Sequence, residues 1–353
     1  MASVRESHER YARAMLLRNV FRSVAGRFGR RRLVATMVVV AIMVGPAPSS
    51  AGASTPSGFR IIPSPRIDGG YLYSVSASSS WNAWAVGEDS WERHGLVLRW
   101  HSGQWTRFST PYDDQVRIWR TVVTTSSKTV WLYGDTSTSP VDEIFLVRWN
   151  GVSFTRIPVP AHNYLGSAEI AALSPTDLWM TWVSLVSPTQ SVWGISHWNG
   201  TAWQEYASCG GGIDMVSHND VWTTGGCHWN GTGMQEIPSS DSNAIDFPWT
   251  VMIEGTGRWD GSDWGLIPMP QRPNDVISFG ATEAWSVGQR QNSQGQWRTL
   301  IEHYVDGAWH DLGGPNASIG PSQLEGGTRI PGTATGMWAV GIGGGYPLIL
   351  RHD

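Results

Sequence analysis

The residues most able to do chemistry are aromatic and acidic side chains that interrupt an otherwise regular pattern. Four aromatic residues of this kind are Trp91, Tyr112, Tyr164 and Trp297. Aromatic plates beside carboxylate, imidazole and amide groups suit a glycan or a peptide ligand. We therefore predict ligand binding by Trp91, His94, Tyr112, Asp113, Asp114, His162, Tyr164 and Trp297.

Catalysis would require a more defined arrangement. A glycosidase needs two carboxylates at a fixed separation, and Glu88, Asp89, Asp113 and Asp114 could supply them. The sequence shows no Cys/His metal spacing, no Gly-rich phosphate loop and no nucleophile elbow. We predict a non-catalytic binding or interaction module without cofactor or metal. The alternative is a polysaccharide-active glycoside hydrolase or lyase that uses loop carboxylates.

A repeated hairpin must position these residues. Trp198-Asn199-Gly200-Thr201-Ala202-Trp203 places two large residues five positions apart around a Gly-containing turn. The pattern returns at Trp100–Trp105, Trp149–Phe154, Trp229–Met234, Trp259–Trp264 and Tyr304–Trp309. Gly at the first turn position favours a type II′ turn, and Asp306-Gly307 favours type I′. Each pair is therefore predicted to face across two antiparallel strands.

A second landmark, Trp-x-x-Gly, precedes most of the hairpins, as in Trp84-Ala85-Val86-Gly87 and Trp338-Ala339-Val340-Gly341, and Trp179-Met180-Thr181-Trp182 is a variant without the Gly. One unit then holds four short antiparallel strands. Six steps separate Trp100 from His352, at about 42 residues a step, the period of four-stranded propeller blades. We predict an all-β, seven-bladed β-propeller, with six blades as the alternative because residues 239–271 are compressed and lack a proper turn before Trp249.

The two ends of the chain complement each other. The last unit stops after its third strand, at residues 348–353, whereas residues 58–65 form an isolated fourth strand. Pairing them would complete the seventh blade, close the ring and cover an exposed edge.

These motifs resemble the secreted Trp-rich propeller repeats of actinobacteria, with their W-A-V-G and W-[DN]-G-x-x-W patterns, over residues 58–353. More distantly they are similar to kelch and Asp-box propellers. The resemblance implies a β-propeller. The Asp-box pattern is matched only in its Gly and Trp, and the Gly pair of kelch repeats is absent, so neither family's chemistry carries over.

The N-terminal residues resemble an export signal. Arg30-Arg31-Arg32 precede an apolar run, Leu33 to Val44, and Ala51-Gly52-Ala53 forms an A-x-A cleavage site. We predict a signal peptide at residues 1–53, of Sec or twin-arginine type, a linker at 54–57 and a single domain at 58–353. The apolar run is too short to span a bilayer. The predicted location is secreted, extracellular or associated with the cell wall.

Charge narrows the choice of partner. Residues 1–53 hold nine Arg and two Glu, so the net charge falls from −4 to −11 without them, and Lys128 is the single lysine. Such an acidic protein is a poor candidate for binding nucleic acid or an anionic membrane. We predict a monomer that binds an extracellular glycan or protein.

The two cysteines, Cys209 and Cys227, lie in connections that emerge on the same face of the predicted propeller. Export would let them oxidise and stay oxidised. We predict a disulfide between them.

Overall fold

The computed structural model describes residues 58–90, 94–136, 143–162, 164, 169–187, 189–207, 209–240, 244–252, 255–269 and 271–353. The chain divides into two units, Met1–Gly52 and Ala53–Asp353, and everything described below belongs to the second unit. Within the described residues, no helix is long and apolar enough to cross a bilayer.

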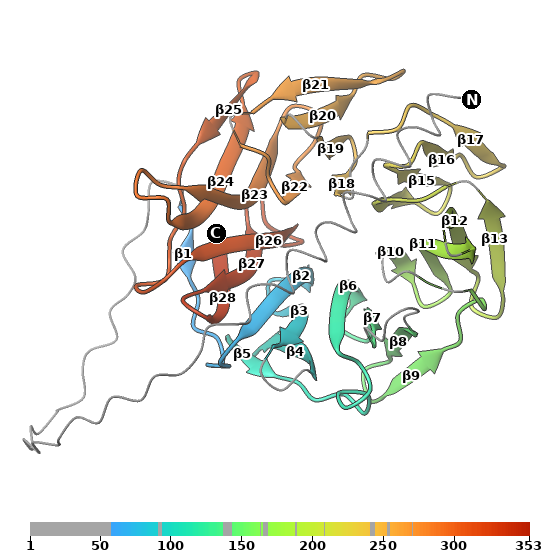
Figure 1. Cartoon of the computed structure of the whole chain (residues 1–353), viewed down its shortest axis with the longest axis horizontal. Coiled ribbons are helices and arrows are strands. Elements are labelled where there is room, and N and C mark those ends of the chain that lie inside the picture. The colour runs from blue at the N-terminus through green and yellow to red at the C-terminus, as the bar shows by residue number, and fades with distance from the viewer. Residues whose placement is uncertain are drawn as a thin grey trace, which may run out of the picture. The chain divides into compact units, whose positions relative to one another are not determined.

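The described strands form seven four-stranded antiparallel sheets, arranged as the blades of a β-propeller (Figure 1). The predicted seven blades are therefore confirmed. Blades 1 to 3 consist of β2 (Gly70–Ser79), β3 (Asn82–Asp89), β4 (His94–His101), β5 (Gln104–Arg107); β6 (Ile118–Ser126), β7 (Thr129–Asp135), β8 (Ile144–Trp149), β9 (Phe154–Ile157); and β10 (Glu169–Ser174), β11 (Asp177–Ser187), β12 (Gln190–Trp198), β13 (Trp203–Ala207).

Blades 4 to 6 follow the same order from the innermost to the outermost strand. They consist of β14 (Ile213–Ser217), β15 (Asp220–Thr223), β16 (Cys227–Trp229), β17 (Met234–Glu236); β18 (Ile245–Asp246), β19 (Trp249–Met252), β20 (Gly255–Trp259), β21 (Trp264–Pro268); and β22 (Asp275–Ser278), β23 (Ala284–Gln291), β24 (Trp297–Val305), β25 (Ala308–Asp311).

Blade 7 joins the two ends of the described chain. It consists of β26 (Ser322–Arg329), β27 (Met337–Gly343), β28 (Tyr346–His352) and β1 (Arg60–Ile61). β1 pairs with β28 in antiparallel register, with Arg60 opposite Arg351. The chain then continues along β28, where Ile62 N donates to Ile349 O at 2.9 Å and Gly69 N donates to Gly345 O at 2.8 Å.

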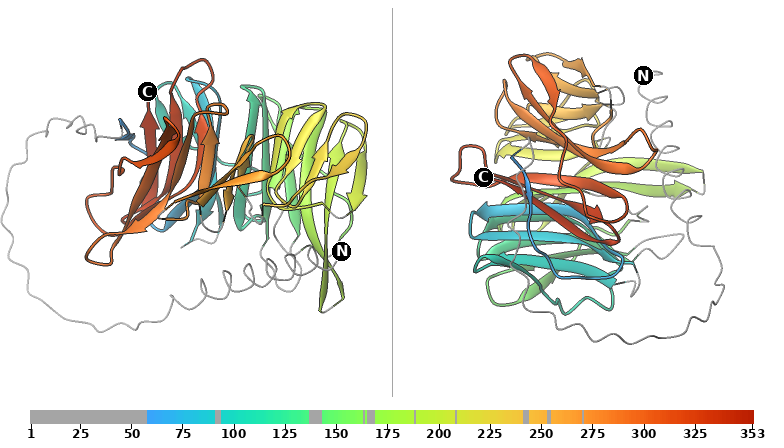
Figure 2. Two further views of the ribbon diagram at one scale, coloured as in Figure 1. Left: turned by 90° about the horizontal axis from the view of Figure 1, so that it is seen from above. Right: turned by 90° about the vertical axis from the view of Figure 1, so that its left-hand side faces the viewer.

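The innermost strands contact one another in sequence around the ring: β2, β6, β10, β14, β18, β22, β26 and again β2. The connections between strands 2 and 3 of a blade, and between strand 4 and the next blade, open on one face, called here the loop face. The 1–2 and 3–4 turns lie on the opposite turn face. Figure 2 shows the blades edge-on, with the long β11–β12 hairpin projecting from the loop face.

Hydrophobic cores fill the seams between neighbouring blades, because each blade buries its flat faces only against another blade. Between blades 1 and 2, for example, Trp84 and Val97 share one buried cluster with Trp119 and Phe145. The seam between blades 4 and 5 is instead aromatic: the Trp222 ring stacks on Phe247 with centroids 4.2 Å apart.

The repeated hairpins pair as predicted. Trp198 faces Trp203 across β12 and β13, and the other five pairs also face each other. Gly200 has φ 97°, and Asp306 and Gly307 both have positive φ, at 56° and 82°. Asn199 Oδ1 accepts hydrogen bonds from Thr201 N and Ala202 N, which fixes the turn.

One tryptophan of strand 2 is buried in every blade, at 0–6% exposure: Trp84, Trp131, Trp179, Trp222, Trp249, Trp285 and Trp338. The compressed region near residue 249 is thus a true fifth blade. Its first turn, between Asp246 and Trp249, contains a cis peptide bond between Phe247 and Pro248.

The predicted disulfide between Cys209 and Cys227 is confirmed, with Cα atoms 5.7 Å apart. Cys227 begins β16, and Cys209 lies in the connection that leads to β14. The bond therefore joins two connections on the loop face beside blade 4, whose four strands have only three to five residues each.

Candidate functional site

The loop residues singled out from sequence lie in three separate places. Trp91 falls outside the described residues. In blades 1 and 2, His94 Nδ1 contacts the main-chain oxygen of Asp113 at 3.1 Å and lies 3.9 Å from Asp114 Oδ1. Tyr112 packs near the Phe145 ring.

Asp113 has a clear structural task in this loop. Its carboxylate accepts hydrogen bonds from Thr110 N at 3.1 Å and from Thr110 Oγ1 at 2.6 Å, which closes the turn. Asp114, by contrast, is 96% exposed. Asp113 is therefore held in place by this turn.

The second place is blade 3. The His162 ring stacks on Trp182 with centroids 4.1 Å apart, and its Nε2 contacts Glu205 Oε1 at 2.6 Å. Tyr164 is buried, and its hydroxyl donates to Pro160 O at 2.5 Å. Burial raises the pKa of Tyr164 above its ordinary value. These groups anchor the β9–β10 connection to β11 and β13.

The third place is blade 6, where Trp297 begins β24 and is 40% exposed. Among the described residues, no hydrogen bond or ring contact connects Trp297 to the two other places. The eight residues thus do not form one described cluster, and their role in binding stays a prediction.

A different polar cluster gathers on the innermost strands of blades 7, 1 and 2. The Tyr71 hydroxyl donates to Glu325 Oε1 and accepts from Gln323 Nε2. The rings of Tyr71 and Tyr73 lie 4.7 Å apart at 30°. The Tyr73 hydroxyl donates to Glu88 Oε1 at 2.6 Å.

The cluster continues into blade 2 through an ion pair between Arg120 Nε and Asp135 Oδ2. We call the whole set of Tyr71, Tyr73, Glu88, Arg120, Asp135, Gln323 and Glu325 the axial site. Except for the fully buried Asp135, its members are all half-buried. Their hydrogen bonds hold them in place while leaving part of each accessible.

Backbone bulges aim these side chains. The inner strands of blades 1, 2 and 7 each carry an extra residue that breaks the register: Tyr73, Arg120 and Glu325. A bulge re-aims one side chain away from the regular alternation. In blades 1 and 2 the bulged residue bonds a carboxylate four positions after the strand-2 tryptophan, Glu88 or Asp135.

The glycine of Trp-x-x-Gly makes room for these bulges. A Cβ at Gly87 would lie 1.8 Å from Tyr71 O, one at Gly134 2.5 Å from Ile118 O, and one at Gly341 2.1 Å from Gln323 O. Only glycine allows so close an approach. Blade 3 has Trp182 at this position, and its β10–β11 register shift lies near the turn instead.

Blades 3 to 6 carry carboxylates on the same inner surface, but use them differently. Asp214 Oδ2 accepts from Phe247 N at 3.0 Å, Asp246 Oδ2 from Ser278 N at 2.9 Å, and Asp275 Oδ2 from Gly327 N at 2.9 Å. Each bond reaches from one blade to the next. Glu169 likewise bonds the backbone of Ile213 in blade 4.

The electrostatics of these four carboxylates are unfavourable. Burial raises the pKa of Glu169 to about 8 and that of Asp275 to about 6, and the Asp275 charge adds to the shift at Glu169. Burial, with the Asp214 carboxylate next, raises the pKa of Asp246 well above its ordinary value. Among the described residues, no group of three or more acidic, His or Cys side chains could hold a metal ion.

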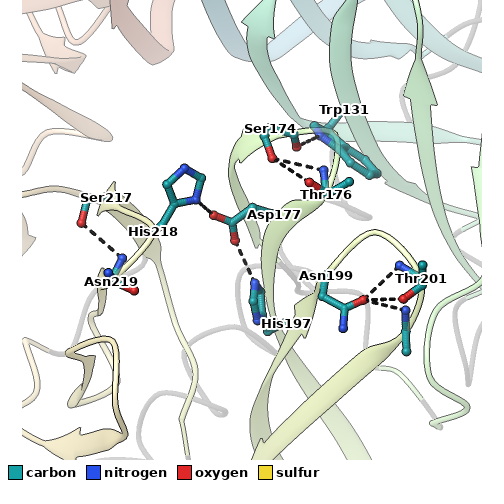
Figure 3. A network of polar contacts seen from close by, with 11 residues as sticks. Trp131, Ser174, Thr176, Asp177, His197, Asn199, Thr201, Ser217, His218 and Asn219 are labelled. Atoms are coloured by element: carbon teal, nitrogen blue, oxygen red, sulfur yellow. Dashed lines mark hydrogen bonds and ion pairs between the residues drawn. The ribbon is translucent and has the colours of Figure 1, made fainter.

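A second polar network lies on the turn face between blades 3 and 4 (Figure 3). Asp177 accepts from His197 Nε2 at 2.8 Å in its own blade, and its other oxygen contacts His218 Nδ1 of the next blade. Trp131 Nε1 donates to Ser174 O across the neighbouring seam at 3.2 Å.

This network is one case of a repeated pairing. The residue opposite the strand-2 tryptophan is a cation-forming side chain in all seven blades: Arg99, Arg148, His197, His228, Arg258, His303 and Arg351. Where it is histidine, an acid two positions before the tryptophan contacts it: Asp177, Asp220 or Glu283. The turn-face network is therefore part of the packing.

The sequence analysis missed most of the axial site. It named Glu88 as a candidate catalytic carboxylate, but not Tyr71, Tyr73, Arg120, Gln323 or Glu325. The available signal was the glycine of Trp-x-x-Gly, which marks where the first strand of the unit can bulge.

Comparisons with known proteins agree with the fold. The chain resembles YCF48 from Cyanidioschyzon merolae, with 14% identity, a TM-score of 0.51, and coverage of 84% of this chain and 98% of that one. It also resembles a fucose-specific lectin from Aleuria aurantia, with 10% identity and a TM-score of 0.46 over 80% and 92% of the two chains. The GH93 α-L-arabinofuranosidase of Fusarium graminearum is similar as well, with 10% identity, a TM-score of 0.43, and coverage of 80% of this chain and 92% of that one.

At this identity the likeness to YCF48 shows the fold alone. No protein-family model matches the chain, and no curated protein matches it. Function must therefore be argued from the site itself.

Proposed function

We propose that the protein is a secreted, non-catalytic binding module for an extracellular glycan, and that the axial site holds the ligand. The observation that carries this proposal is the hydrogen-bonded chain Gln323–Tyr71–Glu325, which crosses the seam between blades 7 and 1. It presents an amide, a phenol and a carboxylate side by side on half-buried residues.

These groups match the chemistry of a sugar. Carboxylate and amide oxygens accept hydrogen bonds from neighbouring hydroxyls, and the faces of Tyr71 and Tyr73 offer apolar surface to the CH groups of a sugar ring. Because the side chains already bond one another, little conformational entropy is lost when the ligand binds. Rigid strands hold them more precisely than loops could.

A glycan array tests this proposal. The protein should bind a restricted set of glycans, and Tyr71→Phe should weaken that binding about tenfold, since it removes the hydroxyl that links Gln323 to Glu325. Tyr346→Phe is the matched control, because the Tyr346 hydroxyl accepts a hydrogen bond from Arg66 and is not part of the Gln323–Tyr71–Glu325 series. Equal loss in both variants, or no binding to any glycan, would reject the axial site.

Export is the second part of the proposal. The disulfide supports an oxidising compartment, and residues 1–53 have the features of a signal peptide. Expression of the full chain in a bacterial host with culture-medium sampling should yield a protein whose N-terminal sequence begins at Ser54. Intact residues 1–53 on a protein retained in the cell would contradict this.

A polysaccharide-active hydrolase remains the second candidate. It is favoured by one observation: Glu88 and Glu325 each bond a tyrosine of the same network, as two cooperating carboxylates could. Turnover of chromogenic glycosides that disappears in Glu88→Gln would establish the enzyme. Unchanged glycan binding without turnover would support the binding module.

A further inference from the structure

We infer that the glycan bound at the axial site carries protonated amino groups, as in glucosamine oligomers. This inference rests on the proposed function, because it specifies the charge of the ligand at that same site. It begins with the tyrosine pair, whose hydroxyls bond carboxylates of two different blades.

The carboxylates contact the tyrosines directly. Glu325 bonds the Tyr71 hydroxyl and Glu88 bonds the Tyr73 hydroxyl. The tyrosine pair therefore has acidic neighbours on more than one blade.

The one arginine of the axial site does not offset this charge. Arg120 is paired with Asp135, whose side chain is fully buried. The other oxygen of that carboxylate, Oδ1, has no hydrogen-bond partner among the described residues. The carboxylates of Glu88, Glu325 and Asp135 thus outnumber the single guanidinium of Arg120, and a ligand that brings positive charge and hydrogen-bond donors would balance them.

An ammonium group supplies both positive charge and hydrogen-bond donors. It donates three hydrogen bonds to carboxylate oxygens, and it is attracted to the negative face of an aromatic ring. A neutral sugar uses the ring faces and the acceptors but leaves the negative charge unbalanced.

The test compares two oligosaccharides with the same backbone, a chitosan hexamer and a chitin hexamer. Titration calorimetry at about pH 6 should show the chitosan hexamer binding at least about tenfold more tightly. Added salt should weaken the chitosan complex more than the chitin complex, since only the first is an ion-pair interaction.

Neutral, isosteric variants assign the effect to the site. The double variant Glu88→Gln/Glu325→Gln should reduce the preference for chitosan to about twofold or less while the Tm stays within a few degrees. Glu236→Gln, an exposed carboxylate on the outer strand β17, is the matched control and should keep the full preference.

The outcomes separate this inference from the proposed function. Equal affinity for the two hexamers, or a preference for chitin, overturns the amine inference and leaves glycan binding intact. Binding to neither hexamer, with other glycans positive on the array, also overturns it. A preference for chitosan that survives in the double variant places the amine elsewhere and contradicts the assignment.

Discussion

Blades 7, 1 and 2 differ from blades 3 to 6 in how their innermost strands are built. β26, β2 and β6 have eight to ten residues and carry bulges, whereas β10, β14, β18 and β22 have two to six. In the long strands, polar side chains bond one another at the axial site. In the short ones, carboxylates bond the backbone of the next blade.

The difference shows how a repeated unit can separate two tasks. Long inner strands bury enough apolar side chains to hold their seams, as Leu72, Val75 and Ala77 of β2 do between blades 7 and 1. Their larger polar side chains bond one another, while Ser74 and Ser76 of β2 accept hydrogen bonds from Val122 N and Thr124 N of blade 2. Short strands have less core to share, so blades 3 to 6 hold their seams with carboxylate hydrogen bonds and a disulfide. The following predictions test this division.

The largest effect should come from removing residues 58–69. This segment supplies β1 and the backbone bonds along β28, so its loss exposes the edge of blade 7 and uncovers Leu350 and the ring of Trp285, on which Phe59 packs. We expect aggregation and a Tm lowered by well over ten degrees. Light scattering and thermal melts measure both, and a monomer with the wild-type Tm would contradict the proposed role of this segment.

A smaller effect is expected from the disulfide in the short-stranded blades. Cys209 and Cys227 are 18 positions apart, and a loop of this size contributes about 3 kcal/mol in the chain-entropy model. The Cys209→Ala/Cys227→Ala variant should lose about that free energy of unfolding in urea titrations. Its ligand affinity should stay unchanged, because the axial site lies on other blades. Loss of binding at unchanged stability would contradict the separation of ligand binding in blades 7, 1 and 2 from seam stabilisation in blades 3 to 6.

A pH-dependent effect is expected in the same blades. Glu169 has a folded pKa of about 8, above its ordinary value, so the folded ring binds more protons than the unfolded chain. Its contribution to stability is present at low pH and is lost as pH rises from about 4.3 toward 8. Glu169→Gln should therefore gain stability relative to wild type over that range.

Urea titrations between about pH 5 and pH 8 measure this difference. Glu236→Gln provides a control at an exposed carboxylate. A Glu169→Gln variant whose stability runs parallel to wild type across the range would show that burial does not perturb this carboxyl group.

Sequence alone could predict the blades because each requires the same packing. The strand-2 tryptophans, the hairpin pairs such as Trp259 and Trp264, and even the short fifth blade follow from periodicity and turn chemistry. The cysteine pair followed from which connections share a face. These features depend on short-range rules that repeat along the chain.

The axial site could not be predicted in this way, because it depends on where bulges interrupt the alternation. Regular alternation assigns Tyr71 and Tyr73 to one side of a strand without saying that Glu325, some 250 residues away, meets them. The loop aromatics were more conspicuous in the sequence. In the structure, however, Tyr164 is buried, Asp113 closes a turn, and Trp297 stands in a different blade.

The central claim is that ligand binding belongs to the axial site and not to the peripheral loops. The most direct measurement compares the affinity of Tyr73→Ala and Trp297→Ala for one glycan positive on the array, by titration calorimetry. We predict that Tyr73→Ala loses at least about tenfold in affinity while Trp297→Ala stays within about twofold of wild type. Loss of binding in Trp297→Ala with retention in Tyr73→Ala would contradict the claim and move the site to the loops.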